Sequence, residues 1–450
     1  MSKALKILVI GKSGRLDAIL TALYRSGRDK KLFVLSEVRN PGLVAKANVT
    51  VGKTDDREGV IKLAREIRPD FAVIGPEEPL AAGIVDCLRE LGIPCVGPSQ
   101  ALARLESSKS FTRTLLSKHG IAGNPEYRVF RTSDGIAEYL RRLGDFVIKP
   151  DGLTGGKGVR VSGDHLQTTD EGFDYAQTLL RESGVVLIEE KLDGEEFSFQ
   201  SFCDGRHVVD MVPVQDHKRA LAGDHGLNTG GMGSYSCEDH LLPFLTTDDI
   251  RTASRINRDV ARALLNDTAE EYKGILYGSF MLTRKGLKVV EYNARFGDPE
   301  AMNVLSILKT DFIDICLGIV EGTLDKIPVE FANKATVCKY VVPRGYPDKP
   351  VKGEPILLDD TGTDRAQLYY AAVNDRDGHL LLTGSRAVAY VGVADTLAEA
   401  ERIAEKAAAS VRGPVVHRED IGTSALIQKR VDHMRSLKSE KPEKALAGAF

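Results

Sequence analysis

A glycine-rich stretch, 146-FVIKPDGLTGGKGVRV-161, carries two lysines among its glycines. Glycine lets the backbone N–H groups approach phosphate oxygens closely, and lysine adds positive charge. Strand-like patterns on both sides of the stretch predict a hairpin flap that closes as a lid. We therefore expect phosphate binding by Lys149 and Lys157; the alternative is a flexible hairpin with two solvated lysines.

A second chemical pattern lies at 287-LKVVEYNARFGDPE-300. Apolar and polar residues alternate there, so Glu291, Asn293 and Arg295 project from the same side of a predicted strand. A carboxylate and an amide oxygen suit Mg²⁺, which prefers oxygen ligands and shares its shell with substrate phosphates. An intramolecular ion pair on a charged strand face is the alternative interpretation.

Acidic residues gather around a turn at 187-LIEEKLDGEEFSFQSF-202, between two strand-like patterns. A hinge of this kind offers backbone groups to the edge of an adenine ring and a carboxylate to ribose hydroxyls. Acids around a turn are more often simply solvated, so this pattern is weak by itself.

The elements that must position these residues begin with alternating strands and helices. Predicted strands at 5–11, 32–36, 71–75 and 93–97 alternate with predicted helices at 15–27, 57–70 and 79–92. This alternation predicts a small doubly wound parallel sheet whose ligand edge carries residues 11–15, 75–78 and 97–99.

The first loop, Gly11 to Gly14, does not match a known phosphate motif. A P-loop would need a glycine at Lys6, and the full dinucleotide fingerprint is missing. By itself the loop is interpreted as a plain strand-to-helix turn.

The rest of the chain continues the α/β pattern. A helix at 107–121 precedes strands at 145–150, 158–162 and 185–190, and beyond residue 330 further strands and a helix at 396–411 predict a small α/β domain. The charged tail lacks a sustained apolar stripe, and we expect it to be mobile and in part helical. The expected domains span residues 1–104, 105–190, 191–330 and 331–427, followed by the tail at 428–450.

Composition narrows the functional classes. The chain has 450 residues, 28% of them charged, and a net charge of only -3, which disfavours nucleic-acid and acidic-membrane partners. The six cysteines show no paired CxxC spacing and are expected to be reduced core residues. Because no signal-like or membrane-spanning apolar run is found, the cytoplasm is the expected location.

Taken in order, these motifs resemble the ATP-grasp ligases and, within them, the phosphoribosylamine–glycine ligase family. The resemblance runs from residue 5 to about residue 426. The motifs that carry it are 75-GPEEPLAAGI-84, 97-GPS-99, 149-KPDGLTGGKGV-159, 189-EEKLDGEEFS-198, 215-QDHKRALAGDHGLNTGGMGSYS-236, 291-EYNARFGDPE-300 and 418-REDIG-422. It implies an α/β ATP-grasp fold with an N-terminal doubly wound parallel-sheet domain and a small C-terminal α/β domain.

The resemblance also implies a reaction. Glycine is joined to 5-phosphoribosylamine through a glycyl phosphate, which gives glycinamide ribonucleotide, ADP and phosphate in purine biosynthesis. The partners would be small molecules only, and the enzyme a monomer or homodimer. Two alternatives stay open, namely a ligase that uses another amine and a non-catalytic ATP-binding regulatory paralogue. The intact set of lysines and metal-binding residue types disfavours the paralogue.

The family's ATP and metal residues map onto the motifs quoted above. The residues implied to bind the phosphates of ATP are Lys109, Lys149, Gly155, Gly156, Lys157, Gly158 and Val159. Those implied to hold adenine and ribose are Glu189, Glu190, Lys191, Leu192 and Glu196, with Glu195 as the weaker choice for ribose. Glu291 and Asn293 are implied to bind Mg²⁺ or Mn²⁺, and Arg295 to neutralise charge on the transferred group.

Four residues are implied to surround phosphoribosylamine, namely Arg15, Glu77, Asp298 and Arg386. The arginines suit the 5-phosphate, and the carboxylates suit the ribose hydroxyls or the amine. Of these, Asp298 is also implied to act at the reacting groups, together with Lys149, Lys157 and Arg295. A solvated arginine near a strand is the alternative for Arg386.

The chain departs from the family pattern in three loops. The first loop keeps Arg15 but has Leu16 and Asp17 where the family has Glu-His, and the later loops read 370-YAAVN-374 and 383-TGSR-386. Each departure is expected on the amine side of the cleft. The alternative of another amine substrate therefore stays open.

Overall fold

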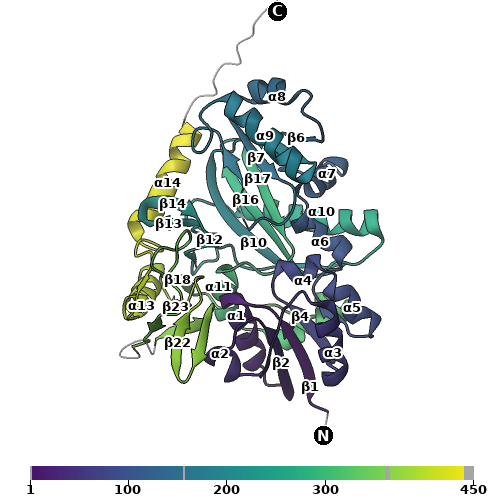
Figure 1. The fold of residues 1–450 in the computed structure, drawn as a ribbon, viewed down its shortest axis with the longest axis vertical. Helices are drawn as coiled ribbons and strands as arrows, with labels where there is room; N and C mark the ends of the chain where they lie inside the picture. Colours follow the sequence, from purple (N-terminus) through teal and green to yellow (C-terminus); the bar gives the residue numbers. More distant parts are fainter. Residues whose placement is uncertain (1–2, 156–157, 360–364, 440–450) are drawn as a thin grey trace, which may run out of the picture.

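The computed structural model describes residues 3–155, 158–359 and 365–439 (Figure 1). Among these residues, no helix combines the length and the apolar character needed to cross a membrane. The chain folds into an N-terminal domain, an upper lobe, a central sheet and a C-terminal domain, which surround one cleft.

The N-terminal domain is the predicted doubly wound sheet. Its strands are all parallel, in the order β3-β2-β1-β4-β5. The strands are β1 (Leu5–Ile10), β2 (Lys30–Ser36), β3 (Asn48–Val51), β4 (Phe71–Ile74) and β5 (Cys95–Val96), and the helices are α1 (Ser13–Tyr24), α2 (Pro41–Val44), α3 (Arg57–Ile67), α4 (Glu77–Ala81) and α5 (Ile84–Glu90). The single helix expected at 79–92 is two helices, because Gly83 adopts a positive φ of 75° between them.

Two helices lead from the N-terminal domain into the upper lobe. They are α6 (Gln100–Ser107) and α7 (Lys109–Lys118), and a four-stranded sheet of order β6-β9-β7-β8 follows. The sheet contains β6 (Tyr127–Phe130), β7 (Phe146–Pro150), β8 (Arg160–Val161) and β9 (Val186–Glu190), and α8 (Ile136–Leu143) and α9 (Thr169–Ser183) pack on it. The lobe buries its own apolar cluster, which lets it sit on the rest of the molecule as a separate unit.

The central sheet has the order β11-β10-β16-β17. Its strands are β10 (Gly194–Asp204), β11 (Val208–Asp210), β16 (Lys273–Thr283) and β17 (Gly286–Asn293), and the nearby helices are α10 (Thr247–Thr268), α11 (Glu300–Ser306) and α12 (Phe312–Glu321). Helix α10 packs on one face, beside the stacked rings of Phe197 and Phe280, whose centroids are 5.7 Å apart. On the opposite face, α12 packs against β10 and β16, and Glu196 and Glu291 line the cleft.

The C-terminal domain is built on a sheet of order β12-β15-β18-β23-β20. The elements are β12 (Gln215–Asp216), β15 (Gly233–Ser236), β18 (Ala335–Pro343), β19 (Pro355–Ile356), β20 (Ala366–Tyr370), β21 (Val373–Arg376), β22 (His379–Leu382), β23 (Val388–Ala394), β24 (Val415–Val416) and α13 (Leu397–Ala409). A separate hairpin of β13 (Arg219–Leu221) and β14 (His225–Asn228), with the 3-10 turn η1 (Ala222–Asp224) at its tip, lies over the cleft. A second 3-10 turn, η2 (Leu324–Lys326), follows α12.

The tail prediction is confirmed in part for residues 428–439: they are helical, as expected, but they are packed against the molecule. They belong to α14 (Ser424–Ser439), whose Leu426, Met434 and Leu437 are buried, and the helix packs on β10. The sequence pattern does not show this apolar stripe, because Arg430 and His433 lie on the same face, where they pair with acidic side chains. Residues 440–450 lie outside the described part of the chain.

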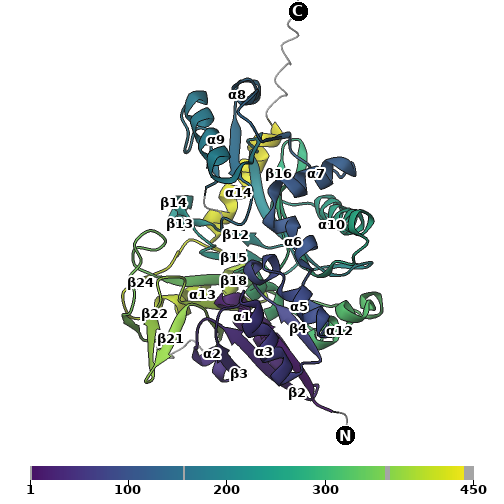
Figure 2. The same ribbon diagram turned by 45° about the vertical axis from the view of Figure 1, so that its right-hand side comes forward.

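Two of the sequence departures meet at the seam between the N-terminal and C-terminal domains (Figure 2). The fully buried carboxylate of Asp17 accepts a hydrogen bond from Lys46 Nζ at 2.6 Å and from the backbone N–H of Tyr370 at 2.8 Å. Close by, Asn40 Nδ2 donates to the carbonyl of Ala371. The departing residues in the first loop and in 370–374 thus belong to one structural contact.

We expect Asp17→Ala to lower the free energy of unfolding by about 3 kcal/mol, since it leaves Lys46 without its buried partner. The measurement is urea unfolding followed by circular dichroism. Glu66→Ala, an exposed change on α3, should shift the same curve by less than about 0.5 kcal/mol. Equal stability of the two variants would contradict a role for Asp17 at the domain seam.

Candidate active site

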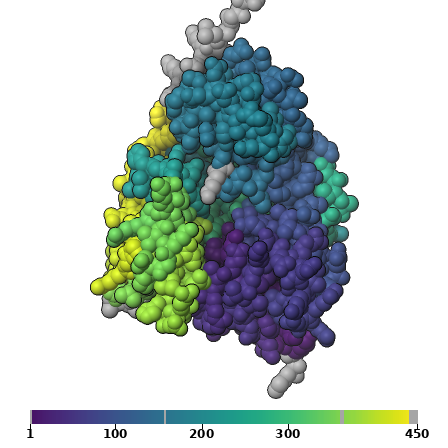
Figure 3. All heavy atoms as spheres, viewed as in Figure 1, coloured from purple at the N-terminus to yellow at the C-terminus, as the bar shows by residue number. Residues whose placement is uncertain are grey.

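One cleft, with a volume of about 650 Å³, lies where the domains meet. Figure 3 shows a recess on this face between the N-terminal domain, the upper lobe and the C-terminal domain. The predicted site residues that line the cleft are Arg15, Glu77, Lys109, Lys149, Gly155, Val159, Glu189, Glu190, Lys191, Leu192, Glu195, Glu196, Glu291, Asn293, Arg295, Asp298 and Arg386. Gly158 does not line it, and Gly156 and Lys157 lie outside the described residues.

A buried ion triad holds Lys149 at the end of β7. Lys149 Nζ lies 2.7 Å from Glu189 Oε2, and Arg113 of α7 makes two bonds to the same carboxylate, of 2.5 and 3.1 Å. Burial acts to raise the pKa of Glu189, but Arg113 and Lys149 outweigh it and lower this pKa to about 2. The triad therefore carries a net positive charge at neutral pH and fixes Lys149 toward the cleft.

The glycine-rich loop is anchored at the start of α7. Asp151 accepts hydrogen bonds from the backbone N–H and the hydroxyl of Ser110, and Lys109 Nζ donates to the carbonyl of Gly152 at 2.8 Å. Gly152 and Gly155 adopt positive φ angles of 123° and 56°, which explains the need for glycine. Burial lowers the pKa of Lys109, and the nearby Lys149 lowers it further, although Glu291 acts in the opposite direction.

The hinge between β9 and β10 supplies backbone groups to the cleft. The N–H of Lys191 donates to the carbonyl of Asp145 at 3.2 Å, whereas within the described residues the N–H of Leu192 has no hydrogen-bond partner. Lys191 also donates its Nζ to the carbonyl of Ser162 at 2.9 Å, which ties the hinge to the upper lobe. The free N–H of Leu192 is the feature that an adenine ring nitrogen requires.

Glu195 and Glu196 face different partners, as neighbouring residues on a strand must. Glu196 forms an ion pair with Lys218 and accepts a hydrogen bond from Ser279, on the side of the sheet that carries Glu291. Glu195 accepts a hydrogen bond from His433 at 2.7 Å and pairs with Arg430. The geometry thus favours Glu196 as the carboxylate that is accessible to a ribose.

Glu291 and Asn293 lie at the end of β17 and provide oxygen donors. Among the described residues the Glu291 carboxylate makes no hydrogen bond or ion pair, while Asn293 Oδ1 accepts from Arg295 Nη2 at 3.2 Å. Burial acts to raise the pKa of Glu291, but positive charges, first those of Lys218 and Lys149, lower it. An ionised carboxylate beside an amide oxygen fits Mg²⁺ or Mn²⁺.

Arg295 is held by acids from two other segments. Its Nε donates to Glu77 at 3.1 Å, and its Nη2 lies 2.8 Å from Glu106 at the end of α6. Arg295 and Arg15 lower the pKa of Glu77 to about 2, in spite of burial. Burial raises the pKa of Glu106, which also receives the backbone N–H of Ala294 at 2.8 Å.

The other end of the cleft is formed by Arg15, Glu77, Asp298 and Arg386. Arg386 is largely enclosed, with 11% of its side chain exposed: it donates to the carbonyls of Gly230, Gly231 and Asp298, and its Nη2 lies 3.2 Å from Asp298 Oδ2. Its guanidinium stacks on the ring of Tyr340, whose hydroxyl donates to Asp298 Oδ1 at 2.6 Å. Arg386 therefore fixes the 228–233 turn against the cleft.

Several cleft residues were not assigned by sequence. They are Glu106, Arg113, Asp216, His217, Lys218, Tyr277, Glu300 and Arg430. The stretch 215-QDHKR-219 belongs to a motif that carries the family resemblance, but the sequence assigns no role to its three central residues. Within the described chain, Asp216 Oδ1 is buried without a hydrogen-bond partner, and burial together with Glu300 raises the pKa of Asp216.

Two of the three sequence departures do not reach this cleft, whereas the third, 383–386, ends in Arg386, which lines it. Leu16 and Asp17 are fully buried in the N-terminal domain, Ala371 is buried at the domain seam, and none of the three is among the lining residues of the described chain. Leu16, Asp17 and Ala371 thus lie where two domains pack, whereas Arg15 and Glu77 line the cleft.

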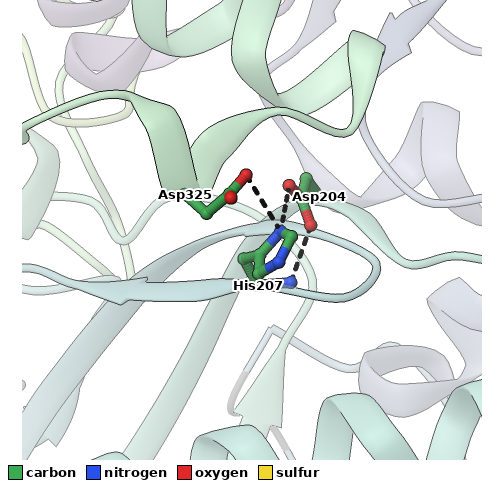
Figure 4. A group of neighbouring side chains, drawn as sticks. All are labelled: Asp204, His207 and Asp325. Carbon is green, nitrogen blue, oxygen red and sulfur yellow. Dashed lines mark hydrogen bonds and ion pairs between the residues drawn. The ribbon is translucent and has the colours of Figure 1, made fainter.

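A second group with metal-ligating side chains lies away from the cleft (Figure 4). Asp204 accepts hydrogen bonds from the backbone N–H groups of Arg206, His207 and Leu324 and from the ring of His207. His207 also lies 3.6 Å from Asp325. Because hydrogen bonds already occupy the Asp204 oxygens, we interpret the group as a closure of the β10–β11 turn.

Comparisons with known proteins agree with this geometry. Models of the N domain, the ATP-grasp (A) domain and the C domain of phosphoribosylglycinamide synthetase match residues 5–106, 107–301 and 336–424. The chain is 48% identical to the phosphoribosylamine–glycine ligases of Methanocella arvoryzae, over 435 residues, and Methanocaldococcus jannaschii, over 445 residues. Each match covers 96% of this chain and 100% of the relative.

Solved structures give the same result. The phosphoribosylamine–glycine ligase of Thermotoga maritima superposes with a TM-score of 0.79 at 27% identity and covers 92% of this chain and 100% of that one. Biotin carboxylase from Campylobacter jejuni, at 14% identity, covers 96% of this chain and 95% of its own with a TM-score of 0.69, which shows a shared fold.

The Glu189 triad generates a prediction about pH. Because the folded-state pKa of Glu189 is about 2 and its ordinary value is 4.5, its contribution is complete above about pH 4.5 and is lost as pH falls toward 2. Glu189→Gln should therefore be less stable than wild type by about 3 kcal/mol at pH 7, and this difference should shrink as pH falls to about 3. Guanidinium unfolding at several pH values measures it; a difference that stays constant with pH would contradict the triad.

Proposed function

The chain belongs to the phosphoribosylglycinamide synthetase family. We propose that the cleft described above binds ATP at the β9–β10 hinge and the amine substrate beside Arg15 and Glu77. It is a carbon–nitrogen ligase that joins glycine to 5-phosphoribosylamine with ATP in purine biosynthesis. One observation supports this division of the cleft into a nucleotide end and an amine end. The hinge, the lysines, Glu291 and the Arg15–Glu77 pair all line the same cleft.

The nucleotide end is proposed to position ATP for attack by the glycine carboxylate, with a glycyl phosphate as the product of that step. The free N–H of Leu192 would donate to a ring nitrogen of adenine. Glu196 would bind ribose hydroxyls once its contact with Lys218 is exchanged. Lys149 and Lys109, with Lys157 of the glycine loop, would contact the phosphates. Preorganised charge of this kind lowers the barrier of phosphoryl transfer.

Glu291 and Asn293 are proposed to hold the divalent cation. Their two oxygens are hard donors, and the carboxylate is ionised and without a protein partner in the described residues, which supports Mg²⁺ or Mn²⁺. When bound, the metal would neutralise phosphate charge. Arg295, held between Glu77 and Glu106, would stabilise charge on the transferred phosphoryl group.

The amine end is proposed to bind phosphoribosylamine. The Nε of Arg15 is buried without a hydrogen-bond partner in the described chain, so it has a donor free for the 5-phosphate. Glu77 and Asp298 are ionised acceptors for ribose hydroxyls or the amine. Arg386 donates hydrogen bonds to backbone carbonyls, and it would act by positioning Asp298 and the 228–233 turn.

We also propose a reducing compartment such as the cytoplasm. All six cysteines are buried free thiols, which supports this location.

Glu291→Ala is expected to lower kcat by at least about 100-fold, because it removes the charged oxygen donor proposed for the cation. Manganese binding, followed by electron paramagnetic resonance, should weaken in parallel, and circular dichroism should stay unchanged. Lys285→Ala, in the exposed turn before β17, is the control and should match wild type. Near-normal activity of Glu291→Ala at low Mg²⁺ would contradict the metal assignment.

Glu77→Gln is expected to lower kcat/KM for phosphoribosylamine by about tenfold to a hundredfold, the value of a charge-assisted hydrogen bond. The KM for ATP should change less than about twofold, because Arg295 keeps Glu106 and Asn293 as partners. Glu78→Gln is the matched control, since its carboxylate pairs with Lys12 at 2.9 Å. If only the KM for ATP changed, the nucleotide and amine ends of the cleft would be assigned the wrong way round.

A further inference from the structure

Helix α14 extends beyond the part of the chain that the family models match. The C-domain match ends at residue 424, and α14 spans Ser424–Ser439. Leu426, Met434 and Leu437 are buried on one face, and this face packs on β10, the strand that follows the nucleotide hinge. The helix is therefore fixed to the central sheet.

The same face of α14 contacts the hinge between β9 and β10. His433 Nδ1 lies 2.7 Å from Glu195 Oε1, and its Nε2 lies 3.2 Å from Asp193 Oδ1. Arg430 Nε lies 3.4 Å from the second oxygen of Glu195, whose side chain is almost completely buried. Since Glu195 directly precedes Glu196, these contacts set where the proposed ribose carboxylate lies.

Arg430 has a second partner on the opposite edge of the cleft. Its Nη2 forms an ion pair with Asp224 at the tip of the β13–β14 hairpin, and Arg430 itself lines the cleft. Asp224 also lies 3.2 Å from Arg418, and Arg418 pairs with Asp420. One guanidinium thus joins the hinge to the hairpin.

At the hairpin, Lys429 and Arg418 also lie beside Asp224, so the contact that depends on Arg430 is the one to Glu195 at the hinge. Beside Arg430 lies His217, which is buried with both ring nitrogens unpartnered in the described chain, and burial and the charges of Arg418 and Arg430 lower the pKa of His217 to about 3. The imidazole is therefore neutral at pH 7 and contributes no charge. Without Arg430, the buried Glu195 would keep His433 as its only basic partner among the residues that the structure describes.

We propose that α14 is a positioning element for nucleotide binding, in which Arg430 holds the hinge and the β13–β14 hairpin at a fixed separation. The inference rests on the proposed place of ATP at the hinge. It assigns Arg430 no contact with the reacting atoms. Its effect is expected in nucleotide affinity, since a displaced hinge shifts Leu192 and Glu196 together.

The test measures binding of Mg²⁺ with the non-hydrolysable β,γ-imido analogue of ATP by calorimetry. Arg430→Gln should weaken binding by about tenfold, the value of a lost charge-assisted contact. Arg430→Lys, which keeps the charge, should recover part of the loss. Arg435→Ala is the matched control, because Arg435 is exposed on the same helix and pairs only with Asp432 in the described chain.

Steady-state kinetics separate positioning from a general loss of structure. In Arg430→Gln the KM for ATP should rise about tenfold, while kcat and the KM for glycine should change less than about twofold. Equal changes in both KM values, or affinity within about twofold of wild type, would overturn the proposal. If Arg430→Gln does not fold, His433→Gln decides in the same assay, since it removes only the hinge contacts.

The wild type distinguishes this proposal from the function on which it rests. If wild type binds no nucleotide analogue, the assignment of ATP to the hinge fails. If wild type binds it and Arg430→Gln and His433→Gln bind it equally well, only the role of α14 fails.

Discussion

The guanidinium of Arg295 is the constraint on which the cleft depends. Its partners come from three segments: Glu77 begins α4 in the N-terminal domain, Glu106 lies at the end of α6, and Asn293 ends β17. A buried cation requires its acids to stay in place, because an unpaired buried charge is costly. The ion network therefore fixes how the N-terminal domain meets the central sheet. Through the one side chain of Arg295, it also couples the proposed amine end of the cleft to the proposed metal site.

Charge balance explains the rest of the nucleotide end. Glu189 alone would cancel the charge of Lys149, but Arg113 supplies a second cation, so the triad stays positive. Glu291 is the opposite case, a carboxylate that no single lysine neutralises in the described residues. Phosphates and a divalent cation would add opposite charges beside these two groups, which is the arrangement that a preorganised phosphoryl-transfer site requires.

Sequence predicted the parts of this site that depend on local pattern. Strand and helix alternation gave the N-terminal sheet, and the period of a strand brought Glu291 and Asn293 together. Arg113 and Glu106 could not be assigned, because each looks like an ordinary polar residue of a helix. Their partners lie 76 and 188 residues away, at Glu189 and at the N–H of Ala294, and only the folded chain brings them together.

The same limit applies to α14. A helix face with only three buried apolar residues does not indicate packing, and the two basic residues between them suggest solvent. In the folded chain these basic residues pair with an acid, because the buried carboxylate of Glu195, 238 residues before His433, needs a basic partner.

The departures from the family pattern follow the same physical logic. Asp17 is tolerated in a buried position because Lys46 and the N–H of Tyr370 supply the donors that its carboxylate needs. Tyr370 opens the second departing segment, and its backbone N–H brings the two segments together at the domain seam. A change that is compensated within one contact does not have to disturb the cleft, and Arg15, two residues before Asp17, still donates to the carbonyl of Gly75 and lies beside Glu77.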